Sequence, residues 1–287
     1  MVLAGDLPGL VVKPELKGVE TIAEDGDTMT LRVAAGENWH AFVERCLREG
    51  CYGLENLALI PGTVGAAPIQ NIGAYGVELE SFVNGVHALS IERGEALVLE
   101  REECSFGYRD SVFKHALRDG VVITAVDLKL PLKPCVKTGY PSLNQHLAEN
   151  RIDSPTPMDV FKAVVDIRSA RLPDPASIPN AGSFFKNPVI DSTSAAYMQA
   201  RHSTMPVFDG GNGRRKLSAA WLIDQCGWKG KRQGGVGVHA EHALVLVHTG
   251  GAKGADLLAL ATQIQESVLD TFGVRLEIEP RVYGAVR

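Results

Sequence analysis

The segment from Ile60 to Gly76 limits the possible folds of this chain most strongly, because it holds four glycines and two prolines with small residues between them. Glycine and proline at this density exclude a regular α-helix. Glycine also allows a backbone to approach a flat or anionic group closely, and the N–H groups of such a loop bind phosphate or the edge of a heterocycle. Neither Gly-Lys-Ser/Thr nor G-x-G-x-x-G is present, so a ligand-facing loop and a pair of tight turns between strands explain the composition equally well.

The segments around this loop carry strand-like and helix-like patterns in turn. We expect a strand over 28–34, a helix over 39–47 that stops at Gly50, a hairpin of 86–91 and 96–99 around Arg93-Gly94, and a strand over 121–130. In the last strand, Asp127 and Lys129 are expected on the face toward solvent. The first half of the chain is therefore mixed α and β.

Proline and glycine also divide the second half. Thr156 is expected to cap a helix that runs to about Arg168, with Pro157 at its first position and Asp159 at its third. The proline-rich stretch 172–179 breaks all periodicity and is the expected domain boundary. Other expected elements are a strand at 10–12, a helix over 216–226, a buried strand over 243–247, a helix over 256–272 capped by Gly273, and a last strand over 274–282.

Composition and charge exclude several classes of protein. With 287 residues, 45% hydrophobic and 22% charged, the chain is an ordinary globular protein long enough for two domains. A net charge of −5 argues against a broad nucleic-acid or anionic-membrane surface, although small anionic ligands remain possible. The chain has neither a secretory leader nor an apolar run near the ~20 residues of a membrane span, so we expect a cytoplasmic protein.

Cysteine and histidine spacing gives two further expectations. Five cysteines without a C-x-x-C pair are typical of reduced cytoplasmic thiols: Cys46, Cys51, Cys104, Cys135 and Cys226. His239 and His242 lack a third ligand at metal-site spacing, so we expect no metal.

Three segments hold candidate chemistry. Ser183, within Asn-Ala-Gly-Ser-Phe-Phe-Lys-Asn, is a nucleophile, a proton donor or a turn serine bonding its own backbone, and it does not match G-x-S-x-G. Arg109 either clamps a carboxylate with two hydrogen bonds or forms a surface ion pair. Glu277 and Glu279 share one face of the last predicted strand, as a general acid or as a solvated pair.

Taken together, these segments resemble the UDP-N-acetylmuramate dehydrogenase family of flavoenzymes, also called UDP-N-acetylenolpyruvoylglucosamine reductases. The resemblance runs from about Gly36 to Gly284, and its strongest segments are 36–39, 53–62, 68–76, 106–111, 180–188 and 221–225. It implies an α+β fold, with an FAD-binding domain of the vanillyl-alcohol-oxidase/PCMH-like type whose N-terminal part is missing, plus a smaller α/β substrate-binding domain. The implied boundaries are a remnant of the first FAD-binding subdomain at 1–17, an FAD-binding subdomain with the flavin-facing loop at 18–170 and 274–287, and a UDP-sugar-binding domain at 171–273.

The resemblance also implies the reaction. Such enzymes reduce the enolpyruvyl ether of UDP-N-acetylglucosamine to UDP-N-acetylmuramate, with hydride passing from NADPH to FAD and on to the substrate, in bacterial peptidoglycan synthesis and hence in cell-wall biogenesis, cell shape and cell division. By motif position Ser183 is the proton donor, and Arg109 and Glu279 are its electrostatic partners. A serine hydroxyl is a very weak acid, so neighbours must stabilise its conjugate base, and Lys186 and Asn187 are nearby in sequence.

The resemblance assigns contacts as well. The implied FAD-binding residues are Pro61, Gly62, Thr63, Gly65, Ala66, Ile69, Ile72 and Gly73. The implied UDP-sugar-binding residues are Tyr75, Tyr140, Arg171, Asn187 and Lys229. Arg171 stands where the family usually has lysine, which keeps the charge but changes the donor geometry, and His242 stands where an amide side chain is expected. We expect a monomer without nucleic-acid or membrane partners.

In this family a small βαβ unit ending in Gly-Ser-Asn precedes the equivalent of Val2 and wraps the FAD pyrophosphate. The resemblance places Met1 just past this unit, so pyrophosphate donors would be lost and strand edges left open. We therefore expect weak FAD retention and poor solubility of the 287-residue form. Two alternatives follow: a truncated chain that only binds a nucleotide-sugar, or another FAD-linked oxidoreductase of the same superfamily.

Overall fold

The structure is a computed structural model that describes residues 1–284. It contains two compact units, a continuous unit of Val11–Arg168 and a discontinuous unit of Met1–Leu10 with the chain from Ser169 onward. The helices are α1 (Trp39–Arg48), α2 (Pro141–Glu149), α3 (Pro157–Arg171), α4 (Ser192–Arg201), α5 (Ala219–Gln225) and α6 (Gly254–Phe272), with short 3-10 helices η1 (Glu55–Leu57), η2 (Val64–Gln70), η3 (Leu79–Ser81) and η4 (Val112–Lys114). The strands are β1 (Val2–Leu3), β2 (Val19–Glu24), β3 (Thr28–Ala34), β4 (Gly73–Ala74), β5 (Val77–Glu78), β6 (Val83–Ser90), β7 (Ala96–Glu100), β8 (Val121–Pro131), β9 (Asn180–Ser183), β10 (Val189–Asp191), β11 (Val207–Asp209), β12 (Arg214–Leu217), β13 (Arg232–Gln233), β14 (Val236–Val238), β15 (Val245–His248) and β16 (Val282–Tyr283).

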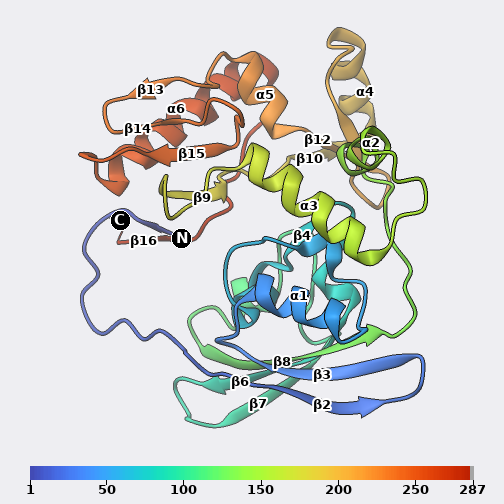
Figure 1. The fold of residues 1–287 in the computed structure, drawn as a ribbon. Helices are drawn as coiled ribbons and strands as arrows, with labels where there is room; N and C mark the ends of the chain where they lie inside the picture. The colour runs from blue at the N-terminus through green and yellow to red at the C-terminus, as the bar shows by residue number, and fades with distance from the viewer. Residues whose placement is uncertain (285–287) are drawn as a thin grey trace. The chain divides into compact units, whose positions relative to one another are not determined.

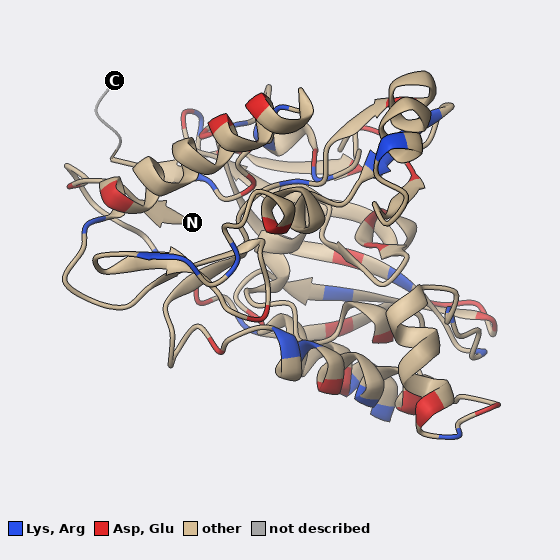
Figure 2. Ribbon diagram, turned by 90° about the horizontal axis from the view of Figure 1, so that it is seen from above, with Lys and Arg blue, Asp and Glu red and all other residues tan. Residues whose placement is uncertain are grey.

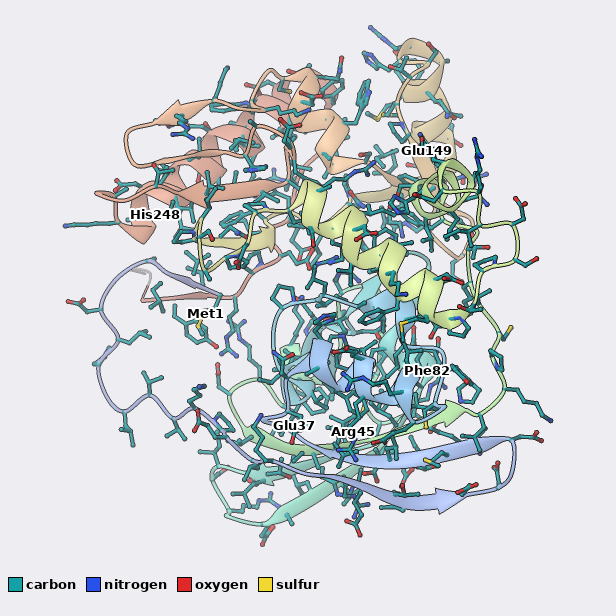
Figure 3. All side chains as sticks on the ribbon, viewed as in Figure 1. Met1, Glu37, Arg45, Phe82, Glu149 and His248 are labelled. Atoms are coloured by element: carbon teal, nitrogen blue, oxygen red, sulfur yellow. The ribbon has the colours of Figure 1, made fainter. Side chains whose placement is uncertain are left out.

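The continuous unit is built on a five-stranded antiparallel sheet in the order β2-β3-β8-β6-β7, with α1 on one face (Figure 1). The helix buries Trp39, Phe42 and Val43 in the same core as Leu31 and Leu128 of the sheet. Side chains fill the space between α1 and the sheet (Figure 3). The spacing of apolar residues predicted this helix correctly, and its buried stripe anchors the loop that follows it.

Asp127 of β8 corrects one expectation. The residue is buried, at 5% exposure, although Lys129 two residues later is exposed. The Arg32 guanidinium donates two hydrogen bonds of 2.8 Å to the carboxylate, and His87 Nε2 lies 2.9 Å from Oδ2. Strand alternation placed Asp127 on the outer face of the sheet correctly, but it did not show that partners from β3 and β6 would cover the carboxylate there.

The discontinuous unit has a four-stranded antiparallel sheet in the order β13-β14-β15-β9. α6 packs against this sheet and buries Leu257, Ala261, Ile264 and Val268, as the sequence predicted (Figure 1). A second sheet in the order β10-β12-β11 and the parallel pair β1–β16, in which Val2 lies opposite Val282, complete the unit.

Several predicted elements are confirmed with small shifts. β3 and the hairpin of β6 and β7 lie where expected, and α3 begins at Pro157 with Thr156 and Asp159 forming the expected reciprocal hydrogen bonds. α6 ends at Gly273, whose φ is 67°. The predicted strand over 243–247 forms as β15 from Val245 to His248.

Three other predicted elements are wrong in whole or in part. Residues 10–12 form no strand, and Leu10 and Val11 are 89% and 76% exposed. The helix expected over 216–226 begins only at Ala219, because Lys216 and Leu217 pair as part of β12 with two neighbouring strands.

The strand expected over 274–282 is the third. Within the described residues it is reduced to β16 and one isolated bridge between Ile278 and Phe185. Pro280 has no N–H group to donate to a strand partner, which accounts for the break before β16.

The predicted functional subdomains stay predictions. As compact units, the chain divides between Arg168 and Ser169, and residues 274–284 group with Ser169 onward. Residues 285–287 of the predicted 274–287 segment lie outside the described residues.

Charge and thiols complete the description of the chain. Lysine, arginine, aspartate and glutamate are spread over both units (Figure 2). Over residues 1–284, the structure has no helix with the length and apolar character needed to cross a bilayer. All five cysteines are free thiols, and Cys46, Cys51 and Cys104 are buried. Burial, with nearby glutamates, raises the pKa of the Cys104 thiol to about 12.

Candidate active site

The glycine-rich segment forms the 3-10 helix η2 and the turns on either side of it. One side of the segment is buried, including Val64 and Gly65, and Gly65 donates its N–H to Ala35 O at 2.9 Å. A Cβ atom at Gly65 would overlap Ala35, so only glycine allows this close approach to the residue that follows β3. The other side exposes small or apolar residues: Pro61, Gly62, Ala66 and Ile69. The loop therefore presents an exposed surface made mainly of backbone and small side chains.

Gly62 is an open point of this surface. Its φ is 129°, a conformation that residues with a side chain rarely adopt, and a Cβ atom built there would meet nothing within 4 Å. The exposed backbone can therefore lie directly against a flat ligand.

Arg109 lies at a tight turn beside the same segment. Gly107 and Asp110 exchange backbone hydrogen bonds of 3.1 Å, and Arg109 between them has a left-handed φ of 54°. Its guanidinium Nη2 donates to Gly73 O at 2.6 Å, so the cation is held on the backbone of β4. Asp110, the neighbouring acid, instead contacts His115 Nε2 at 2.8 Å.

Hydrogen bonds also hold the Arg109 turn in place and connect it to η2. The buried hydroxyl of Ser111 donates to Ile69 O at 2.6 Å, and Lys114 Nζ donates to Arg109 O at 2.9 Å. The structure thus brings Arg109 together with Gly73 and Ile69 of the predicted cofactor-binding set.

Tyr75 and Tyr140 of the predicted substrate-binding set also meet. Their rings make an edge-to-face contact with centroids 5.3 Å apart, and Tyr75 has a left-handed φ of 49°. The buried amide of Asn56 donates to Tyr75 O at 3.0 Å and to Lys137 O at 2.8 Å, which links the two segments that carry the tyrosines. Sequence reasoning did not single out Asn56, although it lies in the quoted segment 53–62.

Arg168 of α3 is a second residue that sequence reasoning missed. Its Nε donates to Leu59 O at 3.3 Å, and His40 Nδ1 accepts the Leu59 N–H at 3.1 Å, so both sides of a residue with φ 57° are held. Burial lowers the pKa of the Arg168 guanidinium, and the nearby positive charge of Arg109 lowers it further while Tyr75 opposes the shift. The continuous unit thus concentrates two guanidinium groups and two tyrosines around the loop.

Ser183 and Glu279 lie on adjacent segments of the discontinuous unit. Ser183 ends β9 opposite Val245, and the residue after it, Phe184, accepts the Glu279 N–H at 2.9 Å. Phe184 and Phe185 are fully buried and fix this crossing through an edge-to-face contact. Ser183 and Glu279 are both half-buried. The structure therefore supports the expectation that these two residues belong to one site.

The residues that were nearest to Ser183 in sequence have other partners. Lys186 Nζ lies 2.5 Å from Glu277 Oε1, and Asn187 Oδ1 accepts the Ala219 N–H at 2.9 Å, where α5 begins. Glu277 is therefore paired rather than simply solvated. In the structure, the charged partner of Lys186 is Glu277.

The other predicted substrate residues of this unit lie at element ends. Arg171 is the exposed last residue of α3, and Lys229 is exposed in the turn after α5. His242 Nδ1 accepts the Leu244 N–H at 3.3 Å. The predicted set thus divides in two, with Arg109, Tyr75, Tyr140 and the glycine-rich segment on the continuous unit and the rest on the discontinuous unit.

Comparison with known proteins identifies relatives of both halves. The family model of the UDP-N-acetylenolpyruvoylglucosamine reductase C-terminal domain matches residues 174–283, and an FAD binding domain model matches residues 2–100. The UDP-N-acetylenolpyruvoylglucosamine reductase of Chromobacterium violaceum is 52% identical over 283 residues, which is 98% of this chain and 83% of that protein. That of Burkholderia mallei is 50% identical over 282 residues, 98% of this chain and 81% of that protein.

A solved structure is similar as well. The crystal structure of the reductase of the same name from Thermus caldophilus superposes with a TM-score of 0.59 and 26% identity, covering 88% of this chain and 72% of that one. The matches confirm the predicted α+β fold, with an FAD-binding part and a second domain.

Proposed function

This chain belongs to the UDP-N-acetylenolpyruvoylglucosamine reductase family, and on that premise we propose which of its residues carry the reaction. It is an NADPH-dependent flavoenzyme that reduces the enolpyruvyl ether of UDP-N-acetylglucosamine to UDP-N-acetylmuramate, a step of peptidoglycan synthesis. The observation that carries the residue assignment is the crossing at Phe184, which places the segments of Ser183 and Glu279 side by side.

The glycine-rich segment fits an FAD isoalloxazine ring. Pro61, Gly62, Ala66 and Ile69 expose a surface with little side-chain bulk, and Gly62 leaves open space where a Cβ atom would stand. We assign FAD contacts to these residues and to Thr63 and Gly73, whereas Gly65 and Ile72 are buried and set the shape of the segment from below. Bound FAD supplies the hydride, which it receives from NADPH.

Ser183 is assigned as the proton donor. During reduction, the substrate carbon beside the carboxylate gains negative charge and must receive a proton, because an enol ether takes up both a hydride and a proton. The Ser183 hydroxyl transfers that proton and is left as an alkoxide, which is then reprotonated by water. Lys186 forms an ion pair with Glu277, so we assign the stabilisation of this charge to groups other than Lys186.

Arg109 and Glu279 are assigned as the electrostatic partners. A guanidinium stabilises the negative charge that spreads onto the substrate carboxylate, and its planar donors suit that group. The hydrogen bond from Arg109 to Gly73 O fixes the cation next to the flavin-facing backbone. The Glu279 N–H donates to Phe184 O, which fixes the Glu279 backbone beside the segment that carries Ser183.

The UDP-sugar is assigned to Tyr75, Tyr140, Arg171, Asn187 and Lys229. The two tyrosines offer an aromatic surface with hydroxyl groups, and the exposed cations Arg171 and Lys229 suit a diphosphate. His242, whose Nδ1 accepts the Leu244 N–H, stands where an amide side chain is expected in the family.

We also place the reaction in the cytoplasm, in a monomer that serves cell-wall growth and therefore cell shape and division. The five free thiols support a reducing compartment. Light scattering of the purified protein tests the monomer.

The experiment that tests the assignment of Ser183 is Ser183→Ala. NADPH is expected to bleach the flavin absorbance as in the wild type, while formation of UDP-N-acetylmuramate falls by about 10²–10⁴-fold, the usual contribution of a positioned proton donor. Ser203→Ala, at an exposed serine of the same unit, is the matched control and is expected to keep full turnover. Wild-type turnover in Ser183→Ala would remove Ser183 from the mechanism.

A further inference from the structure

We propose that Asn71 is a positioning residue for Arg109, holding the turn that carries the guanidinium against the flavin-facing strand. The inference rests on the proposed function of Arg109 as the partner of the substrate carboxylate. Asn71 itself touches neither substrate nor cofactor in this assignment, because its side chain is fully buried at 0% exposure.

Asn71 occupies the residue directly after η2, with a left-handed φ of 43°. Its side-chain Oδ1 accepts the Glu80 N–H at 2.9 Å. Its Nδ2 lies 3.1 Å from Gly107 O, 3.2 Å from Glu78 Oε2 and 3.3 Å from Glu80 Oε1. One buried amide therefore joins η2, β5, η3 and the turn at Gly107.

The acceptors around Nδ2 need a donor between them. The two carboxylates and the Gly107 carbonyl all present negative oxygen atoms toward the same point, and an amide with two hydrogens is what holds them together. Without that donor these groups repel one another, since the Arg101 guanidinium, 3.8 Å from Glu80 Oε2, is too far away to hydrogen-bond there. Gly107, the first residue of the Arg109 turn, then moves away from η2.

Other hydrogen bonds also hold the Arg109 turn to the flavin-facing segment. Ser111 Oγ holds Ile69 O on the far side of the turn, and Arg109 Nη2 reaches Gly73 O from its tip. Asn71 holds the near side through Gly107. A Cβ atom at Gly73 would lie 2.9 Å from both Arg109 Nη1 and Glu78 Cγ, so the guanidinium and the Glu78 side chain lie against the same backbone that Asn71 adjoins.

A displaced Arg109 turn affects one half of the catalytic cycle. A misplacement of about 1 Å costs a reacting group up to about 10²-fold in rate. Because Arg109 is assigned to the substrate carboxylate, the loss is expected in reduction of the UDP-sugar and not in reduction of the flavin by NADPH.

The primary test is Asn71→Gly. Glycine keeps the left-handed backbone and deletes only the side chain. In stopped-flow single turnover, oxidation of the reduced holoenzyme by the enolpyruvyl UDP-sugar is expected to slow 10- to 100-fold, while reduction by NADPH changes less than threefold. Asn212→Gly, at an exposed asparagine with φ 48°, makes the same chemical change and is expected to alter neither rate.

A double-mutant cycle with Arg109→Met separates positioning from a general structural role. If Asn71 acts through Arg109, Asn71→Gly changes the oxidation rate less than threefold once Arg109 is Met. Multiplying losses, or equal slowing of both half-reactions, would overturn the proposal. So would a wild-type oxidation rate in Asn71→Gly.

Hydrogen–deuterium exchange of the flavin-free chain gives a readout that does not depend on activity. Asn71→Gly is expected to speed exchange of the amides of residues 107–110, and Asn212→Gly is not. If the wild type does not reduce the UDP-sugar, the proposed function fails, and the exchange result still tests the contact. Asn71→Asp, which is isosteric but replaces the donor by an acceptor, is the second variant. Loss of bound FAD in both Asn71 variants would overturn the proposal, because it would assign Asn71 to the whole cofactor segment.

Discussion

At the scale of single residues, Asp127 shows how a charge is accommodated inside the continuous unit. Its side chain is 7% exposed, and its carboxylate is bound by Arg32 and His87 from two different strands. Burial acts to raise the pKa of the Asp127 carboxyl, but the hydrogen bonds and charges of Arg32 and His87 outweigh it and hold the pKa below its usual value. The ionised form is therefore the one that the folded state prefers.

Asp127→Asn is expected to lower the free energy of unfolding by about 1.5–3 kcal/mol at pH 7, since it removes hydrogen bonds to a charged group in a buried site. A pKa that is lower in the folded state adds stability above the unfolded pKa of about 4 and loses it as pH falls through the folded pKa. The difference between wild type and variant should therefore shrink from pH 7 to pH 3 in urea unfolding. Asp27→Asn, at the exposed pair with Lys133, should change stability by less than about 1 kcal/mol. A difference for Asp127→Asn that stays constant with pH would contradict this account.

The candidate site was predictable where residue types carry chemistry. The family resemblance predicted Ser183, Arg109 and Glu279, and the composition pointed to the glycine-rich segment; these assignments stay predictions. Asn71 and Arg168 were not predicted, because their importance lies in contacts with Gly107 and Leu59, which are far away in sequence. An asparagine in a left-handed conformation is visible only in the folded chain.

At the scale of elements, local signals were reliable where they were sufficient. The start of α3 needs only Thr156 and Asp159, which exchange hydrogen bonds of 2.9 and 3.2 Å with each other's backbone N–H groups. The predicted start of α5 was too early, because Lys216 and Leu217 lie in β12 and pair with strands from elsewhere in the chain. Tertiary pairing of this kind leaves no periodic trace in the sequence.

Thr156→Ala is expected to lower the free energy of unfolding by about 1 kcal/mol, through loss of the N-cap of α3. Chemical denaturation followed by circular dichroism measures it. Ser154→Ala, at an exposed residue two positions earlier, is the control and should have no effect. An equal loss in both variants would show that the cap itself contributes nothing.

At the scale of the whole molecule, two separate cores account for two units. Leu128 belongs to the core of the continuous unit and Leu246 to that of the discontinuous unit, and both are 0% exposed. The sequence indicated two domains from length and from the break at 172–179. It could not show that the first strand belongs with the last, because such a pairing depends on residues at both ends.

Leu128→Ala and Leu246→Ala are each expected to cost about 2–5 kcal/mol, the range for a buried leucine. Native-state hydrogen exchange should show faster exchange mainly within the unit that carries the substitution, and each variant serves as the control for the other. Equal loosening of both units by either variant would mean that the cores are not energetically separate.

The pairing of β1 with β16 sets an order of events during synthesis. Residues 11–168 leave the ribosome as one uninterrupted stretch with their own core, so they can fold while the rest is still being made. Val2 has to wait for Val282, its partner in the parallel pair. At 5–20 residues per second, the wait is on the order of 15–60 s. During that interval β1 lacks its β16 partner, and the discontinuous unit can close only after Val282 has been made.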